Sequence, residues 1–163
     1  MRRKDREVTN PCEISSILSK SHVIRLGFFD EEAGYPYIVP LSCACTYDKA
    51  SGALTFYLHC AKEGRKVTLM EKNNRVCFEL DEVIGIKKGD APCDYGMCYS
   101  SIIGVGRLLK IPDDDLEGKR AALDLIMKHH GASGDLNYNP EILKRTTVLR
   151  LEAESFTAKS CLP

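Results

Sequence analysis

Apolar and polar residues alternate with a period of two over much of this chain, which is typical of β-strands with one buried face. Residues 53–60 place Leu54, Phe56 and Leu58 on one face and polar or half-polar residues on the other. The same alternation predicts further strands at residues 23–29, 35–47, 76–80, 98–111 and 146–157.

Three other segments have the apolar spacing and the end signals of helices. Asn10 can cap a helix over residues 11–21, and Pro11 fits its first position. Gly64 and the residues around it open a second helix that runs to about residue 72. The third helix follows Pro112 and ends at His129-His130-Gly131, before a loop at 132–140; its apolar face is expected to consist of Leu116, Leu123, Ile126 and Met127.

Short turns connect most of the predicted strands. The segments 30–34 and 48–52 have the length and composition of hairpin turns. We therefore expect a mainly β fold, an antiparallel sheet of six strands with flanking helices. Closure of this sheet into a small barrel would remove its exposed edges.

Composition narrows the classes of protein that this chain can belong to. Its 163 residues, of which 44% are hydrophobic and 28% charged, predict a single globular domain spanning residues 1–163. Lys+Arg and Asp+Glu both number 23, so nucleic acid is disfavoured as a partner. No apolar run reaches the roughly 18 residues of a membrane span. The first residues resemble no export or transit signal, so the expected location is the cytoplasm.

Eight cysteines are many for this length. Without an export signal a disulfide framework is not expected. Cys43-x-Cys45 and Cys93-x4-Cys98 lack the usual spacing of paired zinc ligands, although a structural metal is an alternative to weigh. The better interpretation is reduced thiols packed as small apolar side chains, with no metal bound.

The strongest candidate for chemistry is the stretch His59-Cys-Ala-Lys-Glu-Gly-Arg-Lys66. It joins a predicted strand to a predicted helix, whose N-terminal N–H groups and dipole attract anions. Gly64 allows close approach, while Arg65 offers a planar fork and Lys66 a point charge to a phosphate group. The alternative is that both cations are solvated charges on a surface helix.

Residues 37–42 form a second candidate segment. Pro40 cannot donate to a ladder, so it predicts an edge or a bulge. An unpaired stretch would leave backbone groups of Leu41 and Ser42 free to bind a flat polar ring. An ordinary edge strand is the alternative, and these residues alone favour it.

The strand at 98–111 carries a third set of candidates. Ser100 and Ser101 are polar residues in an apolar strand and can bind ligand hydroxyls, face solvent or satisfy a neighbouring backbone group. Gly104 and Gly106 indicate a bend or a close backbone approach.

The four histidines differ in what they indicate. His129 and His130 lie at a helix end, where a cation is favoured, and His22 is uninformative. His59 shares the strand end that leads to the phosphate-like loop, so it can contact a ligand ring. A metal or heme ligand is the less favoured interpretation of His59.

Taken in order, these motifs resemble the FMN-binding split barrels related to pyridoxamine 5'-phosphate oxidase, in particular the nitroimidazole-resistance (Nim-like) branch. The likeness covers nearly the whole chain, to about residue 157. The residues that carry it lie at 2–6, 37–42, 56–66, 73–79 and 99–107.

The resemblance implies a six-stranded split barrel that forms a homodimer with two FMN sites at its interface. It places Arg65 and Lys66 on the FMN phosphate, with Lys62 as a further contact beside Gly64. The residues that it places around the isoalloxazine ring and ribityl chain are Val39, Pro40, Leu41, Ser42, His59 and Cys60. Ser101 matches a polar cofactor-contact position on a strand near the interface.

The resemblance and the residues leave three functions open. The first is an FMN-dependent oxidoreductase that passes electrons from an NAD(P)H-type donor to a nitroaromatic or quinone-like acceptor, with no identified catalytic acid or base and with His59 as the side chain to test for proton supply. The second is a flavin- or heme-binding protein without turnover. The third, a metal-bound structural protein, comes last. The tail at 158–163 lacks the basic pattern near the C-terminus of the vitamin B6 oxidases, so that activity is not expected.

Overall fold

The computed structural model describes residues 3–162, so Arg2 of the opening basic stretch lies outside the described residues. Its strands are β1 (Glu7–Val8), β2 (Val23–Phe28), β3 (Tyr37–Tyr47), β4 (Leu54–Ala61), β5 (Arg75–Lys87), β6 (Gly96–Lys110) and β7 (Thr146–Cys161). Its α-helices are α1 (Pro11–Lys20), α2 (Arg65–Lys72), α3 (Leu116–His129) and α4 (Pro140–Arg145), and short 3-10 turns lie at Lys4–Arg6 and Pro92–Asp94.

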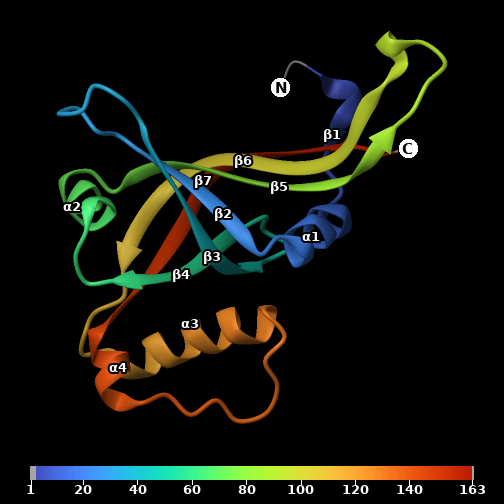
Figure 1. The fold of residues 1–163 in the computed structure, drawn as a ribbon. Coiled ribbons are helices and arrows are strands. Elements are labelled where there is room, and N and C mark those ends of the chain that lie inside the picture. Colours follow the sequence, from blue (N-terminus) through green and yellow to red (C-terminus); the bar gives the residue numbers. More distant parts are fainter. Residues whose placement is uncertain (1–2, 163) are drawn as a thin grey trace.

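The strands form one antiparallel sheet that closes on itself (Figure 1). The order of the seven strands is β1-β7-β4-β3-β2-β5-β6, and β7 also pairs with β6. All strands except β1 therefore belong to the closed ring, and β1 adds a short edge to β7. The predicted six-stranded antiparallel barrel is confirmed.

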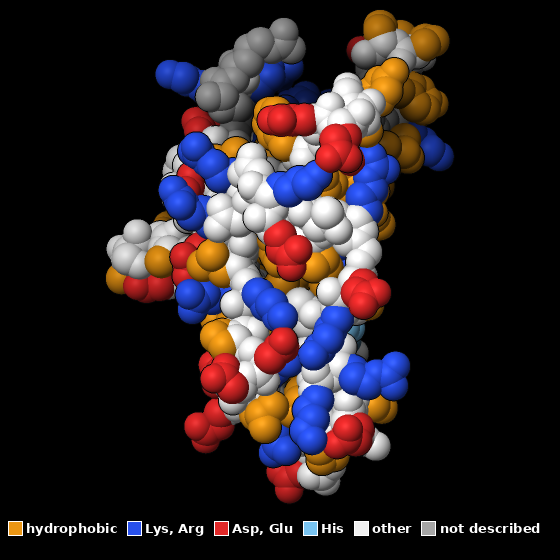
Figure 2. Space-filling model, turned by 90° about the vertical axis from the view of Figure 1, so that its left-hand side faces the viewer, with side chains coloured by type: hydrophobic (Ala, Val, Ile, Leu, Met, Phe, Trp, Pro, Cys, Tyr) orange, Lys and Arg blue, Asp and Glu red, His pale blue; other side chains and the backbone are white. Residues whose placement is uncertain are grey.

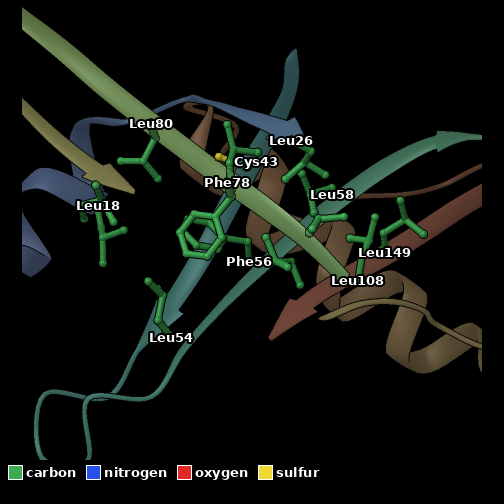
Figure 3. Packing of buried hydrophobic residues seen from close by; sticks show 14 of the residues in the cluster. Leu18, Leu26, Cys43, Leu54, Phe56, Leu58, Phe78, Leu80, Leu108 and Leu149 are labelled. Carbon is green, nitrogen blue, oxygen red and sulfur yellow. The ribbon is translucent and has the colours of Figure 1, made fainter. Parts of the chain in front are cut away.

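The inward-facing apolar side chains of the strands fill the barrel interior (Figure 3). Phe56 and Phe78 meet edge to face with ring centroids 5.2 Å apart, a favourable aromatic geometry. Leu54 and Leu58 on β4 are 2% and 0% exposed, as their period of two predicts. The predicted inward face of this strand is confirmed.

Helix α3 lies across the outer side of the barrel and encloses a second apolar cluster. Ala122, Leu123 and Ile126 pack there with Val148 of β7 and with Ala44 of β3.

Two of the side chains expected on the apolar face of α3 are not buried. Leu116 and Met127 are each 42% exposed, whereas Lys119 is fully buried. The Lys119 Nζ donates to Asp113 Oδ1 at 2.9 Å and to the Leu143 carbonyl at 3.4 Å, so the helix turns a satisfied charge inward.

Helix ends follow their capping residues. The Asn10 side chain accepts from the Cys12 N–H at 2.8 Å, which confirms the predicted start of α1. The six-residue helix α4 is not among the predicted helices, yet it begins with the same signature, Asn139 followed by Pro140. Its length is too short for an apolar period to show.

Glycine allows β6 to approach its neighbours closely. A Cβ added to Gly106 would lie 2.3 Å from the Glu152 carbonyl oxygen, and one added to Gly104 would lie 2.4 Å from the Phe78 ring. The register with β7 also shifts between Val105 and Gly106. Both predicted effects, close approach and irregularity, are confirmed.

On the face that Figure 2 shows, Lys and Arg side chains are mixed with Asp and Glu side chains and form no large patch of one charge. This mixture agrees with equal numbers of acidic and basic residues. Within residues 3–162, every helix is too short or too polar to cross a bilayer.

Candidate functional site

The barrel opens where β3 changes its neighbour. Residues 37–42 of β3 pair with β2, and residues 43–47 pair with β4. The last pair between β3 and β4 is Cys43–Leu58, after which β4 continues on β7 alone. The first half of β3 and the end of β4 therefore bound an opening in the barrel wall, termed the split.

The register shows which backbone groups face the split. Cys43 donates its N–H to the His22 carbonyl at 3.1 Å, and Asp48 donates to the Ala53 carbonyl at 2.9 Å. In an antiparallel ladder, every second residue directs both backbone groups to the same neighbour. The backbone groups of odd-numbered β3 residues therefore face β2. Those of even-numbered residues face β4 after Cys43 and face the split before it.

Pro40 and Ser42 are thus the residues of β3 whose backbone groups point into the split. Pro40 stands where no partner strand would accept an N–H, so the proline causes no loss of pairing. The expectation for Leu41 needs correction, because its backbone groups face β2. On the opposite side, the same alternation directs the backbone groups of His59 and Ala61 toward the split.

Side chains divide between the two faces of the barrel wall. Val39, Leu41 and Cys60 pack against the core from inside. By the alternation of the strands, Pro40, Ser42 and His59 project outward. Of the predicted ring contacts, these outward residues are the ones that present both side chain and backbone to a ligand on the outer face.

The N-terminus of α2 closes one end of the split. Gly64 has φ +127°, and a Cβ added there would meet no atom within 4 Å, so the backbone is open to a ligand. Among residues 3–162 no side chain caps this helix. The Val67 and Thr68 N–H groups donate to the Gly64 carbonyl, and helix geometry leaves the N–H groups before them without a partner inside the helix. Arg65 is exposed and Lys66 half-buried at this end.

Arg65 is not a freely solvated charge. Its Nε donates to Asp30 Oδ2 at 2.7 Å, and its Cζ lies 4.6 Å from the centre of the Tyr37 ring. Because Tyr37 begins β3, the guanidinium stands at one end of the open stretch 37–42. This stretch is about 17 Å long at the rise of an extended strand.

A group of lysines lies beside the other predicted anion contacts. The Asp113 carboxylate forms ion pairs with the Nζ atoms of Lys110 at 2.8 Å, Lys119 at 2.9 Å and Lys62 at 3.7 Å. Lys110 and Lys119 hold the pKa of Asp113 well below its usual range. The described residues place no carboxylate within ion-pair distance of Lys66, which leaves it as the uncompensated cation of the site.

Cys60 and Thr147 face each other across β4 and β7 at this end of the barrel. Burial raises the pKa of the Cys60 thiol, while Lys66 and Lys110 oppose that shift. Thr147 is 1% exposed, and its Oγ1 has no hydrogen-bond partner among the described residues.

The far end of the split is lined by histidines. The rings of His22 and His129 have centroids 4.7 Å apart, and His130 lies 5.2 Å from His22 and 5.7 Å from His129. His129 Nε2 and the Ser21 carbonyl are 2.8 Å apart. Burial, followed by His22, His129 and His59, lowers the pKa of His130.

Ser101 does not join the other predicted residues within one chain. It pairs with Asp81 of β5 and Lys159 of β7, so β5 and β2 separate it from β3. Its neighbour Ser100 is 4% exposed and its Oγ lacks a partner in the described chain.

The donor set of the split fits a ligand with an anionic end and a flat polar body. Cations and free N–H groups gather at α2, whereas single backbone donors and acceptors follow along Pro40, Ser42 and His59. Across residues 3–162 no three His, Cys, Asp or Glu side chains are arranged to hold a metal ion.

A closed antiparallel barrel with one open seam between neighbouring strands defines the chain as a split β-barrel protein. A family model described as pyridoxamine 5'-phosphate oxidase matches residues 11–160, and the chain belongs to this family. The predicted family is thereby confirmed. A comparison with curated proteins found no match.

Solved structures show the same fold. A candidate 5-nitroimidazole antibiotic resistance protein from Bacteroides thetaiotaomicron is 29% identical with a TM-score of 0.77, and the match covers 94% of this chain and 85% of that one. The FAD and heme binding protein from Mycobacterium smegmatis is 16% identical with a TM-score of 0.80, covering 97% and 75%. The flavocytochrome Anf3 from Azotobacter vinelandii is 16% identical with a TM-score of 0.74, covering 97% and 69%.

Sequence reasoning missed one residue that bears on the site and one buried hydroxyl without a partner in residues 3–162. Asp30 was assigned to a turn, and its contact with Arg65 spans 35 positions, so no local pattern could reveal it. Thr147 alternates as an inward residue beside Leu149, but a threonine in a strand carries no signal that its hydroxyl will lack a partner.

Proposed function

We propose that this protein binds FMN at the split and acts as an oxidoreductase, passing electrons from an NAD(P)H-type donor to a small nitroaromatic or quinone-like acceptor. The observation that carries the proposal is the split itself, with cations and an uncapped helix N-terminus at one end and histidines at the other. The neighbours that bind FAD and heme, or are flavocytochromes, support a cofactor of this class.

The residues of the split would divide the binding between them. Lys66 and the N–H groups of α2 would attract the phosphate dianion, and Arg65 would add a planar donor fork. The Ser42 N–H can donate to a ring oxygen or nitrogen, and the Pro40 carbonyl can accept from a ring N–H. A bound flavin would supply reversible electron transfer, while the protein supplies position and electrostatics.

His59 is the side chain we propose for handling a proton beside the ring. It is exposed on the outer side of β4, and its backbone faces the split. Histidine is the side chain that most often serves as a general acid or base. A His59→Ala variant that reduced an acceptor and bound FMN like the parent would contradict this role.

We further propose that a second copy of the chain covers the outer sheet face and completes the site. This face carries exposed apolar residues from several strands: Val23, Ile38, Met97, Ile103 and Val105. Ser101 has the same outward alternation as Ile103 on β6. In a homodimer it would reach the split of the partner subunit, which explains its distance from the split of its own chain.

A second candidate function is heme binding without flavin turnover. The observation that favours it is the gathering of His22, His129 and His130 near the split, since imidazole is a common axial ligand of heme iron. A sharp Soret band in the purified protein would favour this function over the first.

Variants of the phosphate end test the first proposal. We expect Arg65→Ala/Lys66→Ala to weaken FMN binding by at least about 100-fold, because two charge-assisted contacts are lost. Fluorescence quenching of FMN measures the dissociation constant. Arg120→Ala/Lys128→Ala removes the same charge from exposed positions of α3 and should leave FMN binding unchanged. Equal affinity in both double variants would contradict a phosphate site at α2.

A further inference from the structure

The arginine at the N-terminus of α2 is held on two sides. Its Nε and one terminal nitrogen lie 2.7 Å and 2.6 Å from Asp30 Oδ2. Its Cζ lies 4.6 Å from the centre of the Tyr37 ring, within the range of a cation–π contact. Asp30 comes from the turn after β2, and Tyr37 begins β3, so the two contacts tie α2 to both strands.

Asp30 is itself fixed by its surroundings. Its side chain is 7% exposed, and its Oδ1 accepts from the Ala33 N–H at 3.1 Å. Its carbonyl also accepts from the Gly34 N–H at 3.1 Å, which closes the turn. The Arg65 guanidinium and the Ala33 N–H hold the pKa of Asp30 below its ordinary value, so the carboxylate is charged at neutral pH.

The contact with Asp30 leaves part of the guanidinium available. Arginine carries five N–H donors in a rigid fork, and the edge formed by Nε and one terminal nitrogen is the part that Asp30 uses. The remaining edge can receive a second anion. The Arg65 side chain is 51% exposed, so a ligand can reach it.

The pair with Asp30 also changes what Arg65 can contribute. Together the two side chains are neutral, so the net attraction for a dianion comes from Lys66 and the helix N-terminus. Arg65 contributes hydrogen-bond donors in a fixed orientation. Because Asp30 already holds the guanidinium in place, the side chain loses less conformational freedom when it binds a ligand.

We propose that Asp30 is a positioning residue that holds the free edge of Arg65 toward the ligand phosphate and thereby sets the preference for a phosphorylated flavin over riboflavin. This inference rests on the proposed FMN site. It assigns Asp30 a role opposite to the one its charge alone suggests, since an isolated carboxylate beside a phosphate would repel it.

The test compares two ligands that differ in the phosphate. Dissociation constants for FMN and for riboflavin are measured by fluorescence quenching in the parent protein and in Asp30→Asn, which keeps the shape and can still accept from Ala33. We expect FMN binding to weaken by about tenfold and riboflavin binding to change less than about twofold. Glu32→Gln, which removes another carboxylate of the same turn from its pair with Lys72, should change neither.

The same substitution in the Arg65→Ala background distinguishes an effect on the position of Arg65 from an effect on folding. If Asp30 acts only through Arg65, Asp30→Asn added to Arg65→Ala should leave FMN binding where Arg65→Ala alone puts it. Thermal unfolding of each variant reports the fold independently.

Three results would overturn the inference and leave the proposed function standing. Tighter FMN binding in Asp30→Asn would show that the carboxylate competes with the phosphate. Equal weakening for both flavins would show a purely structural role. A full effect of Asp30→Asn in the Arg65→Ala background would show that it does not act through Arg65. A folded parent protein that binds neither flavin would overturn the proposed function, and the inference with it.

Discussion

The eight cysteines show how far residue type alone predicts environment. Cys43 and Cys98 are buried, as expected for thiols that serve as small apolar side chains, but Cys12, Cys77 and Cys93 are exposed. Burial raises the pKa of Cys43 to about 12 and that of Cys45 to about 11. The pattern of alternation placed Cys43 correctly. It also puts Cys77 on the face of β5 opposite Val76 and Phe78, whereas no period marks Cys12 in the first turn of α1 or Cys93 in a short 3-10 turn.

At the residue scale, His130 should make the stability of the protein depend on pH. Its pKa in the folded state is lowered, chiefly by burial and then by the neighbouring imidazoles. The unfolded chain therefore binds more protons once the pH falls to about 6.5, and folding becomes less favourable there.

We expect the melting temperature to fall between about pH 7.5 and about pH 5.5, and to fall less in His130→Asn than in the parent. Calorimetry at a series of pH values measures this difference. An identical pH profile in both proteins would show that His130 does not cause it.

At the element scale, strands were easier to predict than short helices. Alternation over Leu54, Phe56 and Leu58 located β4, because a period of two needs only a few residues to show. Helix α4 has six residues, and only its cap, Asn139-Pro140, marked it. For α3 the apolar period failed at Lys119, whose burial depends on Asp113 and on a carbonyl of α4.

The long strand β6 provides a matched pair of glycines for a test. Gly106→Ala should destabilise the protein by about 1–3 kcal/mol, because its Cβ would lie 2.3 Å from a backbone carbonyl that cannot turn aside. Gly96 begins the same strand and has nothing within 4 Å, so Gly96→Ala should change stability by less than about 0.5 kcal/mol. Urea unfolding measures both, and equal effects would contradict the close approach of β6 and β7.

At the scale of the whole molecule, the candidate site is assembled from segments far apart in the sequence. The strand–loop–helix unit around Gly64, Arg65 and Lys66 was visible locally, and the proline at position 40 indicated an unpaired edge. That the two border one split depends on β3 changing its partner after Ser42. This long-range pairing could be inferred only from the family resemblance.

The exposed face of β6 leads to a prediction about assembly. If a second copy covers this face, Ile103→Glu should convert the dimer to a monomer, since a charge would then be buried without a partner. Ile142→Glu is the control, because Ile142 is 65% exposed on α4 and Ile103 is 57% exposed on β6. Sedimentation velocity gives the molar mass. A parent protein that sediments as a monomer would contradict the proposed homodimer.

The proposed FMN site is tested most directly by the visible absorption spectrum of the purified protein before and after addition of FMN, followed by removal of unbound flavin. We predict a two-banded flavin spectrum that remains with the protein at one FMN per chain and is lost in Arg65→Ala/Lys66→Ala. A folded protein that stays colourless in excess FMN would contradict this prediction. A sharp Soret band instead of the flavin bands would show that the protein binds heme.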